Sequence, residues 1–137
     1  PPRSTLFPYT TLFRSLPAGE IFATYKISKR REEDISALCG SFRVFVSDAG
    51  VVGMARIAFG GMAATPKRAK AVEAALVGKS WTMETIEAAV SAFAEDYQPI
   101  SDMRASADYR LLTAQNLLKR FFLDVSGQDV RLKREVA

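Results

Sequence analysis

The side chains with the most chemical potential lie in one short polar segment, residues 28–34. Residues 29–31 are all basic, and residues 32–34 are all acidic. Basic side chains could contact phosphate groups, and adjacent carboxylates could do acid–base work. The two clusters nearly cancel in charge, so charge alone favours a solvated loop. A nucleic-acid interface is disfavoured because such interfaces normally lack this compensation.

The composition excludes several classes of active site. The chain has no histidine, which rules out Ser–His and Cys–His catalysis and every zinc site that needs histidine. Its single cysteine, Cys39, cannot form an internal disulfide or ligate an iron–sulfur cluster alone. We expect Cys39 to be a buried small hydrophobe and the chain to be cytoplasmic. No run reaches the roughly 18 apolar residues of a membrane span.

Length and charge define the predicted domain organisation. The 137 residues carry a net charge of +4, with 48% hydrophobic and 25% charged residues, which is typical of one globular domain. Two of the excess charges, Arg3 and Arg14, lie in residues 1–15, a proline-rich head that resembles a translated sequencing adaptor. We therefore predict a non-native head at 1–15, a folded lobe at 16–125 and a flexible tail at 126–137.

Three segments are predicted to be strands. Residues 21–26 are rich in β-branched and aromatic types, and residues 38–46 and 51–59 alternate apolar and polar positions. Residues 47–50 have turn composition, so the second and third strands should form an antiparallel hairpin.

The rest of the chain is predicted to be helical. Thr65 and Pro66 should begin one helix that ends at Gly78, because Thr is a good N-cap and Pro suits the first helical position. A second helix should run from Thr82 to residue 97, and a third from Ser106 to about residue 125. Strands that precede helices in this way indicate an α+β fold, a small antiparallel sheet covered by helices.

The remaining motifs carry little chemistry by themselves. Gly60 and Gly61 follow a strand but match neither a dinucleotide-binding motif nor a P-loop, and a tight turn explains them. Ser106 has no histidine to act as its base and is predicted to be a helix N-cap. From the residues alone, the chain is an α+β domain without a self-contained active site.

Taken together, four segments resemble a specific family. Residues 22–36, 58–69, 102–110 and 115–121 match, in order, the FAD-binding small subunit of xanthine dehydrogenases, which are molybdenum hydroxylases. The matching part is the C-terminal lobe, which is also found in carbon monoxide dehydrogenase flavoproteins, and the resemblance covers about residues 18–124. It implies a three- to four-stranded antiparallel sheet packed against three helices.

The resemblance also implies a function. The chain would be a fragment of an NAD-dependent oxidoreductase of purine catabolism that oxidises xanthine at a molybdenum cofactor. Electrons would pass through two [2Fe–2S] clusters to FAD and then to NAD. The fragment would form one wall of the FAD site beside the preceding FAD-binding lobe. Its other partners would be the iron–sulfur domain and the molybdenum-binding large subunit, and the fragment alone would not be catalytic.

Site residues follow from the same resemblance. A lysine at the position of Lys26 contacts FAD in the family, and a cation there stabilises electron density on the reduced ring. The loop that contains Arg30, Arg31, Glu33 and Asp34 lies beside the flavin near the NAD position. Many eukaryotic members carry Asp in place of Glu33. No residue is assigned a catalytic or metal-binding role.

Two structural arginines and several alternatives complete the expectations. Arg104 and Arg110 are expected to hold the lobe together. The chain could instead be the equivalent lobe of a carbon monoxide dehydrogenase or another aromatic hydroxylase flavoprotein. It could also be an interaction module without a cofactor. The loop at residues 28–32 favours the xanthine branch.

Overall fold

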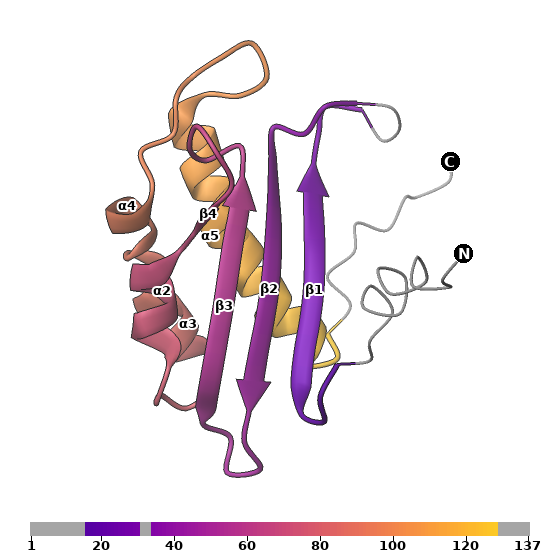
Figure 1. Cartoon of the computed structure of the whole chain (residues 1–137), viewed down its shortest axis with the longest axis vertical. Helices are drawn as coiled ribbons and strands as arrows, with labels where there is room; N and C mark the ends of the chain where they lie inside the picture. The colour runs from indigo at the N-terminus through magenta and orange to yellow at the C-terminus, as the bar shows by residue number, and fades with distance from the viewer. Residues whose placement is uncertain (1–15, 31–33, 129–137) are drawn as a thin grey trace, which may run out of the picture.

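The computed structural model describes residues 16–30 and 34–128, in which helices cover one face of an antiparallel sheet (Figure 1). The strands are β1 (Glu20–Ile27), β2 (Leu38–Val46), β3 (Val52–Gly60) and β4 (Lys67–Arg68), arranged in the order β1-β2-β3-β4. The helices are α2 (Lys70–Leu76), α3 (Met83–Val90), α4 (Phe93–Asp96) and α5 (Ala107–Val125). The predicted α+β class is therefore confirmed, with four strands.

Alternation of side chains decides which face of the sheet is buried. In β2, Phe42 and Val44 are fully buried, whereas Arg43 between them points to the other face. Phe42 is paired with Ala23 of β1 and Ile57 of β3, so apolar residues meet across three strands. β2 and β3 pair antiparallel, which confirms the predicted hairpin. The register matters because a shift of one residue would move every apolar side chain to solvent.

The core lies between the sheet and the long helix α5, which runs diagonally behind the strands (Figure 1). The ring of Phe121 on α5 stacks on Phe42 with a centroid distance of 5.1 Å. Phe59 of β3 meets Phe93 of α4 edge-on at 5.6 Å. These four fully buried rings fix the position of the helices relative to the sheet.

The first predicted helix begins later than expected. Thr65 and Pro66 do not start it. Residues 67–68 instead form β4 against β3, and α2 begins at Lys70. The side chain that caps α2 is Asp96, whose carboxylate accepts hydrogen bonds from the backbone N–H groups of Ala71 and Val72. A cap from a residue about 25 positions away cannot be found in the local sequence.

The second predicted helix is broken in two. Residues 91–92 separate α3 from α4, so Phe93 lies on a separate helical turn. The predicted N-cap Ser106 is confirmed, because its hydroxyl accepts from the Tyr109 N–H, and the second helix begins after Thr82 as predicted, with the Thr82 hydroxyl accepting from the Thr85 N–H. None of the helices in the described ranges is long and apolar enough to cross a membrane.

Within residues 16–30 and 34–128, no helix covers the other face of the sheet (Figure 1). Cys39 lies on this face opposite Lys26 and is half-buried, so the prediction that it is a buried core residue was wrong. Its neighbours Leu38 and Gly40 take the buried positions because side chains alternate along β2. The predicted head at 1–15 lies outside the described residues, as does the tail beyond residue 128, so the predicted boundaries remain predictions.

Candidate functional site

The described candidate residues gather at one end of the sheet, where β1 ends. Lys26 is the last but one residue of β1, and Arg30 and Asp34 lie in the connection that leads to β2. The side chains of Lys26 and Arg30 are exposed, and Asp34 is half-buried. Arg31 and Glu33 lie outside the described residues.

The Asp34 carboxylate accepts hydrogen bonds from the backbone of its own loop. One carboxylate oxygen accepts a hydrogen bond from the Arg30 N–H at 3.0 Å, and the other accepts from the Ile35 N–H at 2.9 Å. The hydrogen bond from the Arg30 backbone, followed by smaller contributions from Ile35 and the charges of Arg30 and Lys26, holds the Asp34 pKa below its usual value. The carboxylate is therefore ionised at neutral pH and closes the loop.

The loop borders two shallow hollows. One, of about 420 Å³, is lined by residues 26–30, three of which are basic. The other, of about 350 Å³, lies between the loop and the start of α5 and is lined in part by Arg104 and Tyr109. Lys29 connects the loop to the segment before α5, because its ammonium group donates to the Met103 carbonyl at 2.8 Å. This end of the sheet is thus a basic surface held against the loop that precedes α5.

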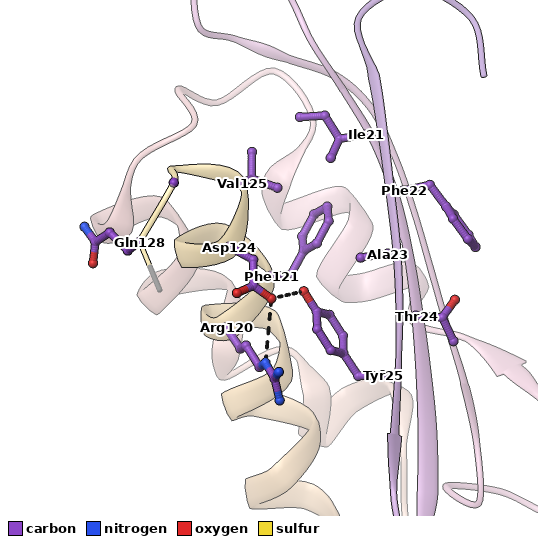
Figure 2. Close-up of a pocket in the computed structure, with 11 residues that line it drawn as sticks. Ile21, Phe22, Ala23, Thr24, Tyr25, Arg120, Phe121, Asp124, Val125 and Gln128 are labelled. Carbon is purple, nitrogen blue, oxygen red and sulfur yellow. Dashed lines mark hydrogen bonds and ion pairs between the residues drawn. The ribbon is translucent and has the colours of Figure 1, made fainter. Parts of the chain in front are cut away.

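A larger groove lies along the free edge of β1, where the sequence had indicated no site. It has a volume of about 720 Å³ and runs between β1 and the C-terminal turns of α5. Figure 2 shows that Ile21, Ala23 and Tyr25 point toward α5, whereas Phe22 and Thr24 point away from it. The sequence could not reveal this groove because its two walls are about 100 residues apart.

Three polar groups close one end of this groove. The Tyr25 hydroxyl donates to the Asp124 carboxylate at 2.6 Å, and Arg120 lies 3.6 Å from the same carboxylate and over the Tyr25 ring (Figure 2). Burial and the hydrogen bond to Asp124 raise the pKa of Tyr25, so its phenol remains protonated at neutral pH. The Arg–Asp–Tyr group therefore joins two elements and provides no activated nucleophile.

The described part of the chain brings no three His, Cys, Asp or Glu side chains together in a way that could hold a metal ion. The candidate site is therefore best described by its basic groups at the end of β1.

Comparison with known proteins places this arrangement in a family. The protein-family model described as "CO dehydrogenase flavoprotein C-terminal domain" matches residues 23–125, which is most of the chain. The chain belongs to this family. The matched range begins in β1 and ends at the last residue of α5, so it includes the sheet, the helices and both hollows.

Individual relatives of this flavoprotein domain include several dehydrogenases. A xanthine dehydrogenase of Emericella nidulans is 33% identical over 92% of the chain, which spans 10% of that protein. A nicotinate dehydrogenase FAD-subunit of Eubacterium barkeri is 34% identical over 77% of the chain, which spans 36% of it. A solved structure of a carbon monoxide dehydrogenase from Hydrogenophaga pseudoflava superimposes with a TM-score of 0.69 at 33% identity, covering 77% of this chain and 36% of that chain. The chain thus spans between about a tenth and a third of these relatives.

The residues at the end of β1 fit a flavin cofactor by their chemistry. The hollow at residues 26–30 offers two ammonium groups and a guanidinium on an open surface, whereas the Ser28 hydroxyl already donates to the Arg30 carbonyl. Such donors suit the electron-rich edge of an isoalloxazine ring or an anionic group beside it. The carboxylate of Asp34 is engaged by backbone N–H groups, so it does not occupy the hollow.

Proposed function

We propose that this flavoprotein domain is one lobe of the FAD-binding part of a molybdenum hydroxylase of the xanthine dehydrogenase type. In this proposal it forms one wall of the FAD site on the route of electrons from xanthine oxidation to NAD. The observation that carries the proposal is the basic hollow at residues 26–30, at the end of a lobe whose residues 23–125 match the flavoprotein family.

FAD, when bound, would supply a two-electron acceptor that also passes electrons onward. Lys26 would contact FAD and would favour negative charge on the flavin ring, which raises the affinity of FAD for electrons. Asp34 would hold the loop through its hydrogen bond from the Arg30 N–H. The Arg30 guanidinium would place a second positive charge at the edge of the loop. Arg31 and Glu33 complete the proposed set and would shape the approach of NAD.

The proposal assigns the substrate chemistry to other parts of the enzyme. The chain has no histidine, and its one cysteine cannot bind a cluster alone, so the [2Fe–2S] clusters and the molybdenum cofactor would be held by partner regions. We infer that these are the preceding FAD-binding lobe, an iron–sulfur domain and a molybdenum-binding large subunit. The assembled enzyme would be cytoplasmic and would serve purine catabolism.

A second candidate differs in substrate. The similarity to a nicotinate dehydrogenase FAD-subunit is as high as that to a xanthine dehydrogenase, at 34% against 33% identity. The similarity to a carbon monoxide dehydrogenase also has a structural counterpart. The sequence of residues 28–32 favours the xanthine branch. Turnover of xanthine, nicotinate and carbon monoxide by the complete enzyme would separate the three.

The test begins with the gene. The sequence upstream of Leu16 should encode a flavin diphosphate-binding lobe, and an unrelated start codon and promoter there would refute the proposal.

The second experiment is made in the full FAD subunit. Lys26→Ala should lower FAD occupancy or shift the flavin midpoint potential to a more negative value. Lys79→Ala is the matched control, since this exposed lysine lies at the opposite end of β3, next to Val52. Equal occupancy and equal potential in the two variants would remove Lys26 from the FAD site.

A further inference from the structure

A buried arginine lies directly behind the candidate loop. Arg110, in the first turn of α5, is only 3% exposed. Burial of a guanidinium is costly unless hydrogen bonds and an opposite charge satisfy it. One terminal nitrogen donates to the carbonyls of Ala37 and Gly61, the latter at 2.6 Å, and the other donates to the Asp102 carboxylate at 2.7 Å. Arg110 therefore faces backbone and an acid, not solvent.

The partners of Arg110 come from three separate segments. Ala37 ends the loop between β1 and β2, Gly61 follows β3, and Asp102 belongs to the segment before α5. Asp102 also accepts from the Arg104 and Ala105 N–H groups at 2.8 and 3.1 Å, which fixes the shape of its own segment. A single side chain thus joins the loop, the end of the sheet and the approach to α5.

Arg110, Asp102 and Gly61 form a cluster that we call the node, and both ends of the loop contact this node or its neighbours. At the C-terminal end, the Ala37 N–H donates to the Ile27 carbonyl at 2.7 Å, while its own carbonyl accepts from Arg110. At the N-terminal end, Lys29 donates to the carbonyl of Met103, the neighbour of Asp102. The position of the loop relative to β1 therefore depends on contacts with the segment that Arg110 and Asp102 hold.

Gly61 is the second component of the node. Its φ of +82° is disfavoured for other residues, and a Cβ atom there would lie 2.5 Å from the Ala37 carbonyl oxygen and 3.1 Å from the Arg110 terminal nitrogen. A Cβ at the adjacent Gly60 would have no heavy atom within 4 Å. Only the second glycine of the pair is required, because Ala37 and Arg110 occupy the space beside it.

We propose that Arg110, with Asp102 and Gly61, is the positioning group that sets where the described parts of the loop, residues 27–30 and 34–37, lie relative to β1. Arg110 does not touch the cofactor in this proposal, because it is buried and directed toward carbonyl groups. Its effect on a flavin rests on the proposed function and would pass through the loop. Its effect on the loop itself does not depend on any cofactor.

The first experiment measures amide hydrogen exchange in the whole chain without FAD. Gly61→Ala and Asp102→Asn should speed exchange of the Arg30 and Ala37 amides by about tenfold or more, because the loop opens without global unfolding. Exchange of the Ile57 amide, which donates to the buried Glu73 carboxylate, should rise much less than exchange of the two loop amides. Gly60→Ala is the matched control and should alter neither region.

Arg110→Lys is the third variant and separates charge from geometry. A lysine keeps the positive charge but lacks the planar fork that reaches two carbonyls and a carboxylate together, so loop exchange should still rise. Unchanged loop exchange in Gly61→Ala and Asp102→Asn would overturn the proposal. An equal rise at Ile57 would also overturn it, since the node would then support the whole fold and not the loop. Gly61→Ala and Asp102→Asn leave Arg110 in place, so the test does not depend on whether Arg110→Lys folds.

The second experiment links the node to the flavin in the full FAD subunit. Gly61→Ala should shift the flavin midpoint potential in the same direction as Lys26→Ala, and Gly60→Ala should not shift it. Faster loop exchange together with a flavin that responds to neither Lys26→Ala nor Gly61→Ala would refute the proposed function and support the positioning role. A flavin that responds to Lys26→Ala, with no response of loop or flavin to Gly61→Ala, would refute the positioning role alone.

Discussion

Asp96→Ala should destabilise the lobe strongly although Asp96 is not one of the candidate site residues. The carboxylate is 8% exposed and accepts from the Ala71 N–H at 3.0 Å and from the Val72 N–H at 3.1 Å. Hydrogen bonds to charged groups contribute about 1.5–3 kcal/mol, and loss of a helix cap costs about 1–2 kcal/mol. The hydrogen-bond value and the helix-cap value describe the same two hydrogen bonds to Asp96, so they are not added together. We therefore expect a loss of about 3 kcal/mol in the free energy of unfolding.

The assay is thermal unfolding of the whole chain at pH 7, followed by circular dichroism. A loss of about 3 kcal/mol in a lobe of this size should lower Tm by about 12 °C. Asp96→Asn, which keeps one carbonyl oxygen as an acceptor, should cost less. Glu95→Ala is the control, because Glu95 is exposed in the same helical turn. If Asp96→Ala lowers Tm no more than Glu95→Ala, Asp96 does not cap α2.

Two further predictions concern the core and the response to acid. Phe121→Ala should cost about 4 kcal/mol because it removes a fully buried ring stacked on Phe42, while Leu112→Ala on the exposed side of α5 should cost under about 0.5 kcal/mol in denaturant titrations. Hydrogen bonds from the Arg104 and Ala105 N–H groups, and then from Arg110, lower the pKa of Asp102 to about 2. A lowered pKa means that this carboxylate stabilises the fold above its ordinary value of 3.8 and loses that contribution as the pH falls toward 2, so Asp102→Asn should flatten the fall of Tm over this range. An equally steep fall in the variant would contradict the assignment.

In the described residues, three of the four strands and two of the four helix starts could be predicted from sequence because their causes are local. Alternation at residues 38–46 reproduced the bounds of β2, and the hydroxyls of Thr82 and Ser106 each accept from an N–H group three residues further along the chain. The start of α2 could not be predicted in this way. Its cap is supplied by Asp96 from a later helix, and residues 67–68 pair with β3 instead of beginning the helix. Tertiary contacts overrode the local preference of Thr65 and Pro66.

The candidate site was predictable in part for the same reason. The cluster at residues 28–34 is visible as a run of charge, and the role that the family resemblance gives it stays a prediction. The groove beside β1 could not be predicted, because Tyr25 and Asp124 are 99 residues apart in sequence. The requirement for Gly61 was equally hidden, since it depends on Ala37 and Arg110. Sequence showed a turn at the glycine pair, and the structure distinguishes the two glycines.

The long separation between partners in this lobe has a consequence for its synthesis. β1 is complete at residue 27, but the helix that covers it, α5, ends only at residue 125. At about 5–20 residues per second, a ribosome needs roughly 5–20 s to make the intervening chain. During that time the apolar face of the nascent sheet lacks its cover, and the ring of Phe42 has no Phe121 to stack upon. The lobe therefore closes late in translation, and the core face of its sheet stays uncovered until α5 has been made.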